Sequence, residues 1–231
     1  MAELSPKEIY DFIGKTVVGQ DESRRVISNA VFLHAVRSFQ DAFEGGDIKK
    51  TNILLMGPSG NGKTLMVREA AKSVREISGR ALAPVLEIDC TTLSAKGWSG
   101  DDVTDFLDEH YTKHRRSMLE FESTIIILDE VDKLCMPAVA KDGHDHNKNT
   151  QYGLLKLVEG SKVYLPKAMK TVDTSKMMFI FAGNFPQIRH MLKAKAKPAM
   201  GFAAPPVKPK PIDIHTQLEK GGMVTQLVGR I

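Results

Sequence analysis

The chain has few of the features that mark a secreted or membrane-bound protein. Its 231 residues include two cysteines, Cys90 and Cys135, so no disulfide framework is expected. No apolar run approaches the roughly 18 residues that a membrane span needs, and the N-terminus lacks the basic and then apolar pattern of a signal peptide. Cys90 ends one expected buried strand and Cys135 follows another, so we expect both to be small buried apolar residues, which fits a reducing cytoplasm.

The chain also lacks a strong charge of either sign. Its formal net charge of +4 is mild and does not by itself favour a nucleic-acid partner. Apolar residues make up 42% of the chain and charged residues 26%, which is ordinary for a globular protein. The length is compatible with one large domain or two small ones.

Residues 57–64 fit the phosphate-loop pattern G-x-x-x-x-G-K-[ST] at every fixed position. The apolar run 52–56 before the loop predicts a buried strand, and residues 63–77 predict a helix. Such a loop closes backbone N–H groups around phosphate oxygens, and Lys63 would reach the β- and γ-phosphates of ATP while Thr64 ligates Mg²⁺. The loop residues that we expect to bind nucleotide are Pro58, Ser59, Gly60, Asn61, Gly62, Lys63, Thr64 and Leu65.

A second β-branched run, residues 123–128, ends in Asp129 and Glu130 about 65 residues after the phosphate loop. We interpret it as a Walker B strand. Asp129 would hold Mg²⁺ through water, and Glu130 would orient and activate the attacking water, because phosphoryl transfer depends mostly on positioning. The alternative is an ordinary buried strand whose last two residues are acids exposed to solvent, without a role in catalysis.

The remaining pattern alternates strand and helix after a helical start. Ser5 and Pro6 open a short helix, and Asp21 caps a long helix that reaches about Phe43. We expect strands near 52–56, 84–89, 124–129 and 177–182, and helices near 63–77, 101–120 and 148–159. This alternation predicts an α/β fold with a parallel sheet and right-handed crossovers.

Two polar stretches predict loops. Residues 136–150 are rich in His, Asp and Lys, and residues 193–211 carry five lysines among prolines and alanines, as mobile linkers do. His144 and His146 lie in the first stretch. Without a third or fourth spaced ligand they favour a solvated loop over a metal site.

With both Walker motifs placed, nearly the whole chain resembles the AAA+ ATPases, and in particular the ClpX and HslU group of protein unfoldases. Residues 129–133 (DEVDK) resemble the group's extended Walker B motif. Residues 151–160 (QYGLLKLVEG) and 172–176 (VDTSK) resemble segments that are more specific for the group than either Walker motif. The resemblance implies a P-loop NTPase (AAA+) large domain over residues 51–231, with helices on both faces of the sheet. It also implies an N-terminal helical segment of the AAA+ module over residues 1–50.

The resemblance also implies residues that contact the adenine of the nucleotide and a residue that lines a central pore. Residues 17–21 (VVGQD) resemble the box that lines the adenine, which places Val18 and Gly19 there. Residues 97–100 (GWSG) resemble the pore-1 loop that grips substrate polypeptide, with Trp98 as the substrate-binding aromatic. Ser99 stands where the group has an aliphatic residue, so this loop is expected to present less apolar surface to the polypeptide. The alternative is a Trp98 buried in the core.

Three further positions carry expected roles. Asn184 resembles the sensor-1 residue and would hydrogen-bond the attacking water or the γ-phosphate; a turn-forming asparagine is the alternative. Arg230 resembles the arginine finger that reaches the neighbouring subunit's nucleotide, against the alternative of an ordinary terminal charge. Residues 200–202, namely Met200, Gly201 and Phe202, fall where ClpX carries the tripeptide that docks into the ClpP peptidase.

Some segments that related proteins carry are missing or shortened in the sequence given. The sequence shows no four-cysteine zinc module before the ATPase and no HslU-type intermediate domain, and its pore-entry loop is shortened to residues 165–171. The sequence given ends one residue after Arg230, where the family continues into a helical lid domain. We expect this lid either on a longer chain or from another chain.

The sequence therefore predicts an ATP-binding and ATP-hydrolysing subunit of a ClpX-like unfoldase, with ATP and Mg²⁺ as cofactors. We expect a ring, hexameric when the lid is present, that acts on unfolded or tagged proteins in the cytoplasm without a membrane partner. A nucleic-acid motor or loader is one alternative, although it should carry a basic, aromatic-bearing hairpin. A non-catalytic regulatory module is another, against which Glu130, Asn184 and Arg230 argue.

Overall fold

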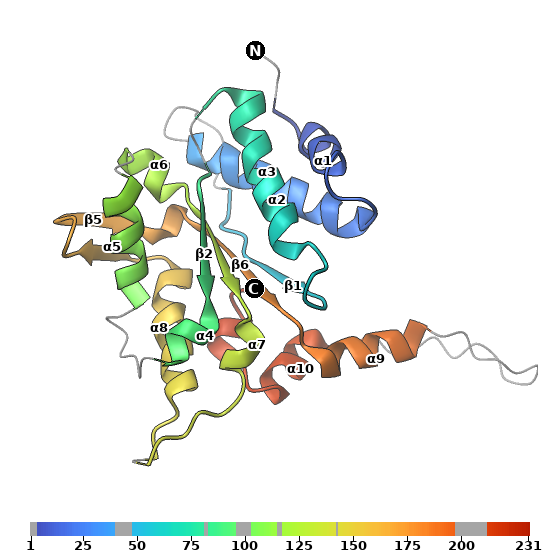
Figure 1. Cartoon of the computed structure of the whole chain (residues 1–231), viewed down its shortest axis with the longest axis vertical. Coiled ribbons are helices and arrows are strands. Elements are labelled where there is room, and N and C mark those ends of the chain that lie inside the picture. Colours follow the sequence, from blue (N-terminus) through green and yellow to red (C-terminus); the bar gives the residue numbers. More distant parts are fainter. Residues whose placement is uncertain are drawn as a thin grey trace, which may run out of the picture.

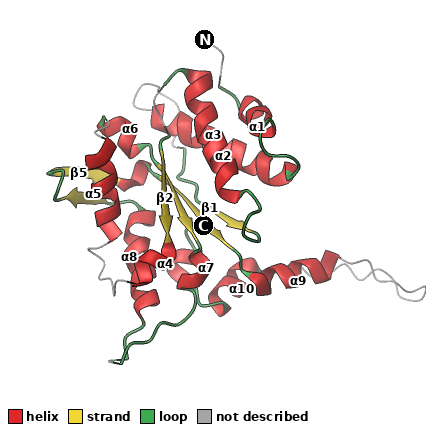
Figure 2. Cartoon of the chain, viewed as in Figure 1, coloured by secondary structure: helices red, strands yellow, loops and turns green. Residues whose placement is uncertain are grey.

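A computed structural model describes residues 4–39, 48–80, 83–95, 103–114, 117–141, 143–196 and 212–231. A parallel sheet runs through its middle with helices on both sides (Figure 1, Figure 2). The strands are β1 (Ile53–Met56), β2 (Val85–Asp89), β3 (Ile125–Asp129) and β6 (Met178–Gly183), in the order β1-β6-β3-β2. The predicted α/β fold with a parallel P-loop sheet is confirmed.

The central strands are buried on both faces because helices cover both sides. Side chains alternate along a strand, so Ile125 and Ile127 join one apolar cluster while Ile126 and Leu128 join the other. All six residues of β6 are buried. Such strands read as continuous apolar runs in the sequence, which is why they were predictable.

Three helices cover one face: α1 (Pro6–Gly14), α2 (Asp21–Phe39) and α3 (Lys63–Ser78) (Figure 1). The start of α1 is a capping box. Ser5 Oγ accepts the backbone N–H of Glu8, and the Glu8 carboxylate accepts the backbone N–H of Ser5. The predicted start of this helix is confirmed, whereas the expected extension of α2 toward Phe43 lies outside the described residues.

The other face carries α4 (Cys90–Ala95), α5 (Val103–His114), α6 (Met118–Glu122), α7 (Val131–Leu134), α8 (His146–Glu159) and an antiparallel hairpin of β4 (Lys162–Leu165) and β5 (Lys170–Asp173). The chain then continues through the 3-10 turn η2 (Thr174–Lys176), α9 (Pro186–Ala196), α10 (Ile214–Lys220) and α11 (Thr225–Val228). Within these described ranges, no helix is long and apolar enough to cross a bilayer.

The prediction of one helix over residues 101–120 is wrong. Helix α5 ends at His114 and α6 begins at Met118, because Ser117 caps a new helix by accepting the backbone N–H of Glu120. Cys90 does not end a strand but opens α4. The Asp89 carboxylate accepts the backbone N–H of Thr91 there and turns the chain out of β2.

Both predicted loops are shorter than expected. The stretch 136–150 ends early because Asp145 accepts the backbone N–H groups of Asn147 and Lys148 and so starts α8 at His146. In the stretch 193–211, residues 193–196 belong to α9, and the part from 197 to 211 lies outside the described residues.

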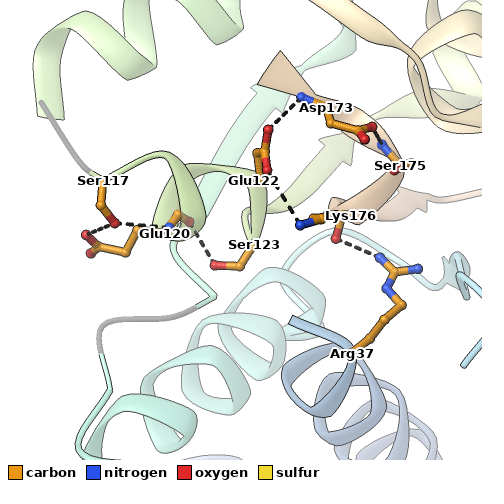
Figure 3. Close-up of polar contacts among 8 residues, drawn as sticks. All are labelled: Arg37, Ser117, Glu120, Glu122, Ser123, Asp173, Ser175 and Lys176. Carbon is orange, nitrogen blue, oxygen red and sulfur yellow. Dashed lines mark hydrogen bonds and ion pairs between the residues drawn. The ribbon is translucent and has the colours of Figure 1, made fainter. Parts of the chain in front are cut away.

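Polar contacts join α2 to the edge of the sheet where β3 and β6 begin (Figure 3). The Glu122 carboxylate accepts the backbone N–H of Asp173 at 2.9 Å and lies 4.0 Å from Lys176 Nζ. Arg37 on α2 donates to the Lys176 carbonyl at 2.6 Å. The amino-terminal edge of the sheet is thereby held by contacts between segments that are far apart in the sequence.

A buried histidine lies beside this edge. His34 Nε2 is 2.7 Å from the carbonyl oxygen of Ser123, so Nε2 carries the proton and donates. Burial above all, with a smaller contribution from the positive charges of Arg37 and Lys50, lowers the pKa of His34 to about 4, although the hydrogen bond to Ser123 opposes this shift. His34 is therefore neutral in the folded protein at neutral pH.

This histidine predicts an acid-sensitive fold. An unfolded histidine has a pKa of about 6.5, so the unfolded chain binds more protons than the folded chain between pH 6.5 and 4. The free energy of unfolding should therefore fall as the pH is lowered through this window, by about 3 kcal/mol from His34 alone. Urea unfolding across the window measures it. The variant His34→Gln keeps an amide donor for Ser123 but does not titrate, so its curve should be flatter; equal slopes would contradict the prediction.

Candidate active site

A cavity of about 420 Å³ opens where β1, β3 and β6 end. Ligands of parallel α/β sheets bind at this carboxyl edge, outside the strand ends. The cavity is lined by Ser59, Gly60, Asn61, Gly62, Lys63, Thr64, Leu65, Asp129, Glu130, Asp132, Lys133, Gly183 and Asn184. The structure thus gathers the expected phosphate loop, Walker B acids and sensor-1 residue at one place.

The phosphate loop connects β1 to α3. Gly57 N–H donates to the Gly183 carbonyl at 3.1 Å and extends the pairing of β1 with β6. Gly60 and Gly62 have φ angles of +77° and +74°, and a Cβ at either would meet no atom within 4 Å. The backbone conformation, not crowding, therefore requires glycine, and loops of this kind turn backbone N–H groups toward an anion.

Lys63 and Thr64 begin α3 beneath the loop. Lys63 Nζ donates to the carbonyls of Gly57 and Pro58, at 2.8 and 2.9 Å, so the ammonium group lies against the loop. Thr64 Oγ1 donates to Asp129 Oδ2 at 3.2 Å. A hydroxyl and a carboxylate held together are hard oxygen ligands, so this pair fits Mg²⁺, and the ammonium fits phosphate.

Glu130 follows Asp129 in an unusual backbone conformation. Its φ of +55° lies in the left-handed region, which costs a residue with a side chain about 1 kcal/mol or more. Its N–H donates to Asp129 Oδ1 at 2.8 Å, which stabilises the turn. Glu130 lines the cavity one residue beyond the acid that contacts Thr64, as a water-activating carboxylate should.

Asn184 is held through both its backbone and its side chain. Its backbone N–H donates to Asp132 Oδ1 at 3.1 Å, and its side-chain oxygen accepts from Arg189 Nη1 at 2.5 Å. Asp132 belongs to the DEVDK motif, but the sequence indicates no role for it. No sequence pattern points to Arg189. Both depend on how β3, β6 and α9 lie in space.

Comparison with known proteins matches residues 53–194 to the AAA family, the ATPase family associated with various cellular activities. The match covers both Walker motifs and Asn184. The chain belongs to the AAA family of ATPases.

Among curated proteins, this AAA domain is similar to subunits described as "ATP-dependent Clp protease ATP-binding subunit ClpX". It is 30% identical to those of Porphyromonas gingivalis and Treponema denticola, over 98% of this chain and 58% of each relative. It is also 30% identical to ClpX 2 of Wolinella succinogenes, over 98% of this chain and 57% of the relative. The chain is thus a ClpX-like AAA ATPase, and it spans somewhat more than half the length of these relatives.

The expected adenine box lies beside the cavity of the AAA domain but does not line it. Val18 is 92% exposed, and Gly19 has a φ of +76°. The next residue, Gln20, donates through Nε2 to the Asn61 carbonyl at 2.9 Å, so the box is tied to the phosphate loop. Pro58 is not among the residues that line the cavity. Its carbonyl oxygen accepts a hydrogen bond from Lys63 Nζ.

Arg230 lies at the opposite end of β1 from the phosphate loop. Its carbonyl accepts from Asn52 Nδ2 at 2.7 Å, and its guanidinium contacts the Glu159 carboxylate at 2.8 and 3.2 Å. Asn52 precedes β1, whereas the loop follows it. A four-residue strand is about 13 Å long, so Arg230 does not belong to the cavity of its own chain.

Two groups of expected residues are not among those that the structure describes. Trp98 of the pore-1 resemblance and residues 200–202 of the docking resemblance lie outside the described residues. His146 is the first residue of α8, and Asp145 caps that helix. In the part of the chain that the structure describes, no group of three or more His, Cys, Asp or Glu side chains is arranged to hold a metal ion.

Phe185 and Asp132 leave little space for a side chain at Gly183, so substitution there should destabilise this AAA domain. A Cβ there would lie 2.7 Å from the Phe185 ring and 2.8 Å from Asp132 Oδ1. Gly183→Ala should therefore lower the free energy of unfolding by about 1–3 kcal/mol, through crowding, in a urea titration. The control is Gly57→Ala, whose Cβ would meet its nearest atom at 3.4 Å. An equal loss in both variants would contradict the crowding at Gly183.

Proposed function

We propose that this chain binds ATP and Mg²⁺ in the cavity, hydrolyses the ATP, and uses the cycle to translocate and unfold polypeptides. One observation carries the proposal. The Thr64 hydroxyl donates to the Asp129 carboxylate at 3.2 Å, which joins the phosphate loop to the Walker B strand at the floor of one cavity. Glu130 and Asn184 line the same cavity, where a terminal phosphate and its attacking water would lie.

Phosphate binding would use the loop and Lys63. The lysine ammonium now donates to two carbonyls of the loop, and it can exchange these neutral acceptors for charged phosphate oxygens, which bind it more strongly. The N-terminus of α3 adds its positive dipole end. Bound Mg²⁺ would neutralise charge on the β- and γ-phosphates, with Thr64 as its protein ligand and Asp129 holding it through water.

Hydrolysis would use Glu130 as the residue that orients the attacking water and accepts its proton. Asp129 accepts from the Thr64 hydroxyl, and Glu130 lines the same cavity one residue later, so one carboxylate can serve the metal and the other the water. Asn184 would hydrogen-bond at the terminal phosphate. These residues supply positioning and charge, which is what phosphoryl transfer requires.

Action on polypeptides is proposed from the relatives and from the resemblance of residues 97–100 to a pore-1 loop. The similar curated proteins are described as ATP-binding subunits of a Clp protease. We propose Trp98 as the residue that grips a polypeptide, since a large aromatic contacts any chain without sequence preference. We also propose residues 200–202 as the contact to a ClpP-type peptidase.

A ring is proposed because Arg230 lies far from the cavity of its own chain. If it acts on a nucleotide, that nucleotide belongs to a second copy, whose charge it would neutralise in the transition state. We further propose that residues 1–50 form a helical segment of the module and residues 51–231 its large domain.

The nucleotide assignment predicts two separable defects. Lys63→Ala should lose ATP affinity by about tenfold or more, because the phosphates lose their main protein counter-charge. Glu130→Gln should bind ATP almost as the unaltered chain does but hydrolyse it about 10²-fold more slowly, since an amide cannot accept the proton. Fluorescent-nucleotide titration and phosphate release measure the two quantities. Normal hydrolysis by Glu130→Gln would remove the Walker B assignment.

The pore assignment predicts a loss of coupling without a loss of hydrolysis. Trp98→Ala should retain basal ATP turnover but fail to unfold a fluorescent protein that carries an unstructured tail, while Trp98→Tyr keeps the aromatic grip and the activity. Normal unfolding by Trp98→Ala would contradict the assignment. If turnover in the unaltered chain rises with DNA and not with an unfolded protein, the nucleic-acid motor replaces the unfoldase.

A further inference from the structure

The side chain of Asn184 has a strong partner outside the cavity. Its amide oxygen accepts from Arg189 Nη1 at 2.5 Å, and Arg189 is a half-buried residue near the start of α9, the helix that leaves the carboxyl end of β6 (Figure 1). The backbone N–H of Asn184 is held separately by Asp132 at 3.1 Å. Position and side-chain rotation of Asn184 are therefore set by two different residues.

Arg189 determines the orientation of the Asn184 amide, that is, on which side its oxygen and its NH₂ group lie. A guanidinium has N–H donors and no acceptor, so it can face the amide oxygen but not the amide NH₂ group. With the oxygen held by Arg189, the NH₂ group lies on the other side of the planar amide. Asn184 lines the cavity. Since Arg189 holds the oxygen, we infer that the NH₂ group is the part of the side chain that can face a ligand there.

We propose that Arg189 is a positioning residue that fixes Asn184 as a hydrogen-bond donor for the terminal phosphate of ATP. Phosphate oxygens are acceptors at neutral pH, so an NH₂ group suits them, whereas an amide oxygen would face them unfavourably. The same donor would be unused by ADP, which lacks that phosphate. The proposal rests on the proposed nucleotide site and adds a residue that distinguishes ATP from ADP.

The test compares ATP and ADP affinities of the whole chain. All variants are made in the Glu130→Gln background, so that ATP persists during a fluorescent-nucleotide titration. Arg189→Gln should lower the ratio of ATP affinity to ADP affinity by about tenfold, with ADP affinity unchanged, and Arg189→Lys should restore part of it. His190→Gln, an exposed neighbour on α9, is the control and should keep the original ratio.

A double-mutant cycle separates positioning from direct contact. If Arg189 acts through Asn184, then Arg189→Gln should cause no further loss in a chain that already carries Asn184→Ala. Additive losses would show that Arg189 contacts the nucleotide itself and would overturn the proposal. An unchanged ratio in Arg189→Gln would overturn it as well.

A second variant tests the donor role without altering Arg189. Asn184→Asp keeps an oxygen for Arg189 but has no N–H group, so it should lose the preference for ATP. A retained preference would overturn the proposal. If the unaltered chain binds neither nucleotide, the nucleotide site itself fails, and the inference fails with it. If the chain binds both and Lys63→Ala abolishes binding, only the result with Arg189 and Asn184 bears on this inference.

Discussion

The cavity depends on the burial of β3 and β6 on both faces. Inside these strands every side chain is packed between two layers of helices, so polar groups can emerge only at the strand ends. Because the strands are parallel and in register, with Leu128 opposite Phe181, their carboxyl ends reach the same edge of the sheet. Asp129 and Asn184 meet there for that reason.

The register between β1 and β6 then sets how closely the phosphate loop approaches Asp129 and Asn184. Met56 lies opposite Gly183, and the loop begins with a hydrogen bond from Gly57 to the Gly183 carbonyl. Gly183 also lies against Asp132, where a side chain would collide with the carboxylate. One backbone position therefore fixes the separation between the loop and the Walker B segment, and a hydroxyl at Thr64 closes the remaining gap to Asp129.

Local patterns made much of this arrangement predictable. The strands are continuous apolar runs, and the loop has its glycines, lysine and threonine at fixed spacing, so neither depends on distant contacts. The break between α5 and α6 was missed because Ser117 caps a new helix inside a stretch whose residues otherwise suit one long helix. Lys193 and Lys195 were assigned to a linker on composition alone, although α9 extends through them.

The contacts around Asn184 were not predictable, because they join segments that the sequence does not relate. Asp132 lies 52 residues before Asn184 and contacts it only through the register of β3 with β6. Arg189 lies five residues after Asn184, a spacing that has no meaning until Pro186 starts α9 and sets its direction. The resemblance named the asparagine, and only the fold supplies the groups that orient it.

Strand β6 connects the cavity to Arg230. At its carboxyl end it leads into Gly183 and Asn184, and near its amino end the backbone N–H of Phe179 donates to Asn52 Oδ1 at 3.2 Å. Asn52 in turn donates to the Arg230 carbonyl. A six-residue strand is about 20 Å long, and a strand buried on both faces resists bending because its packed side chains cannot shift independently. The cavity and the backbone of Arg230 are therefore held at opposite ends of one rigid strand.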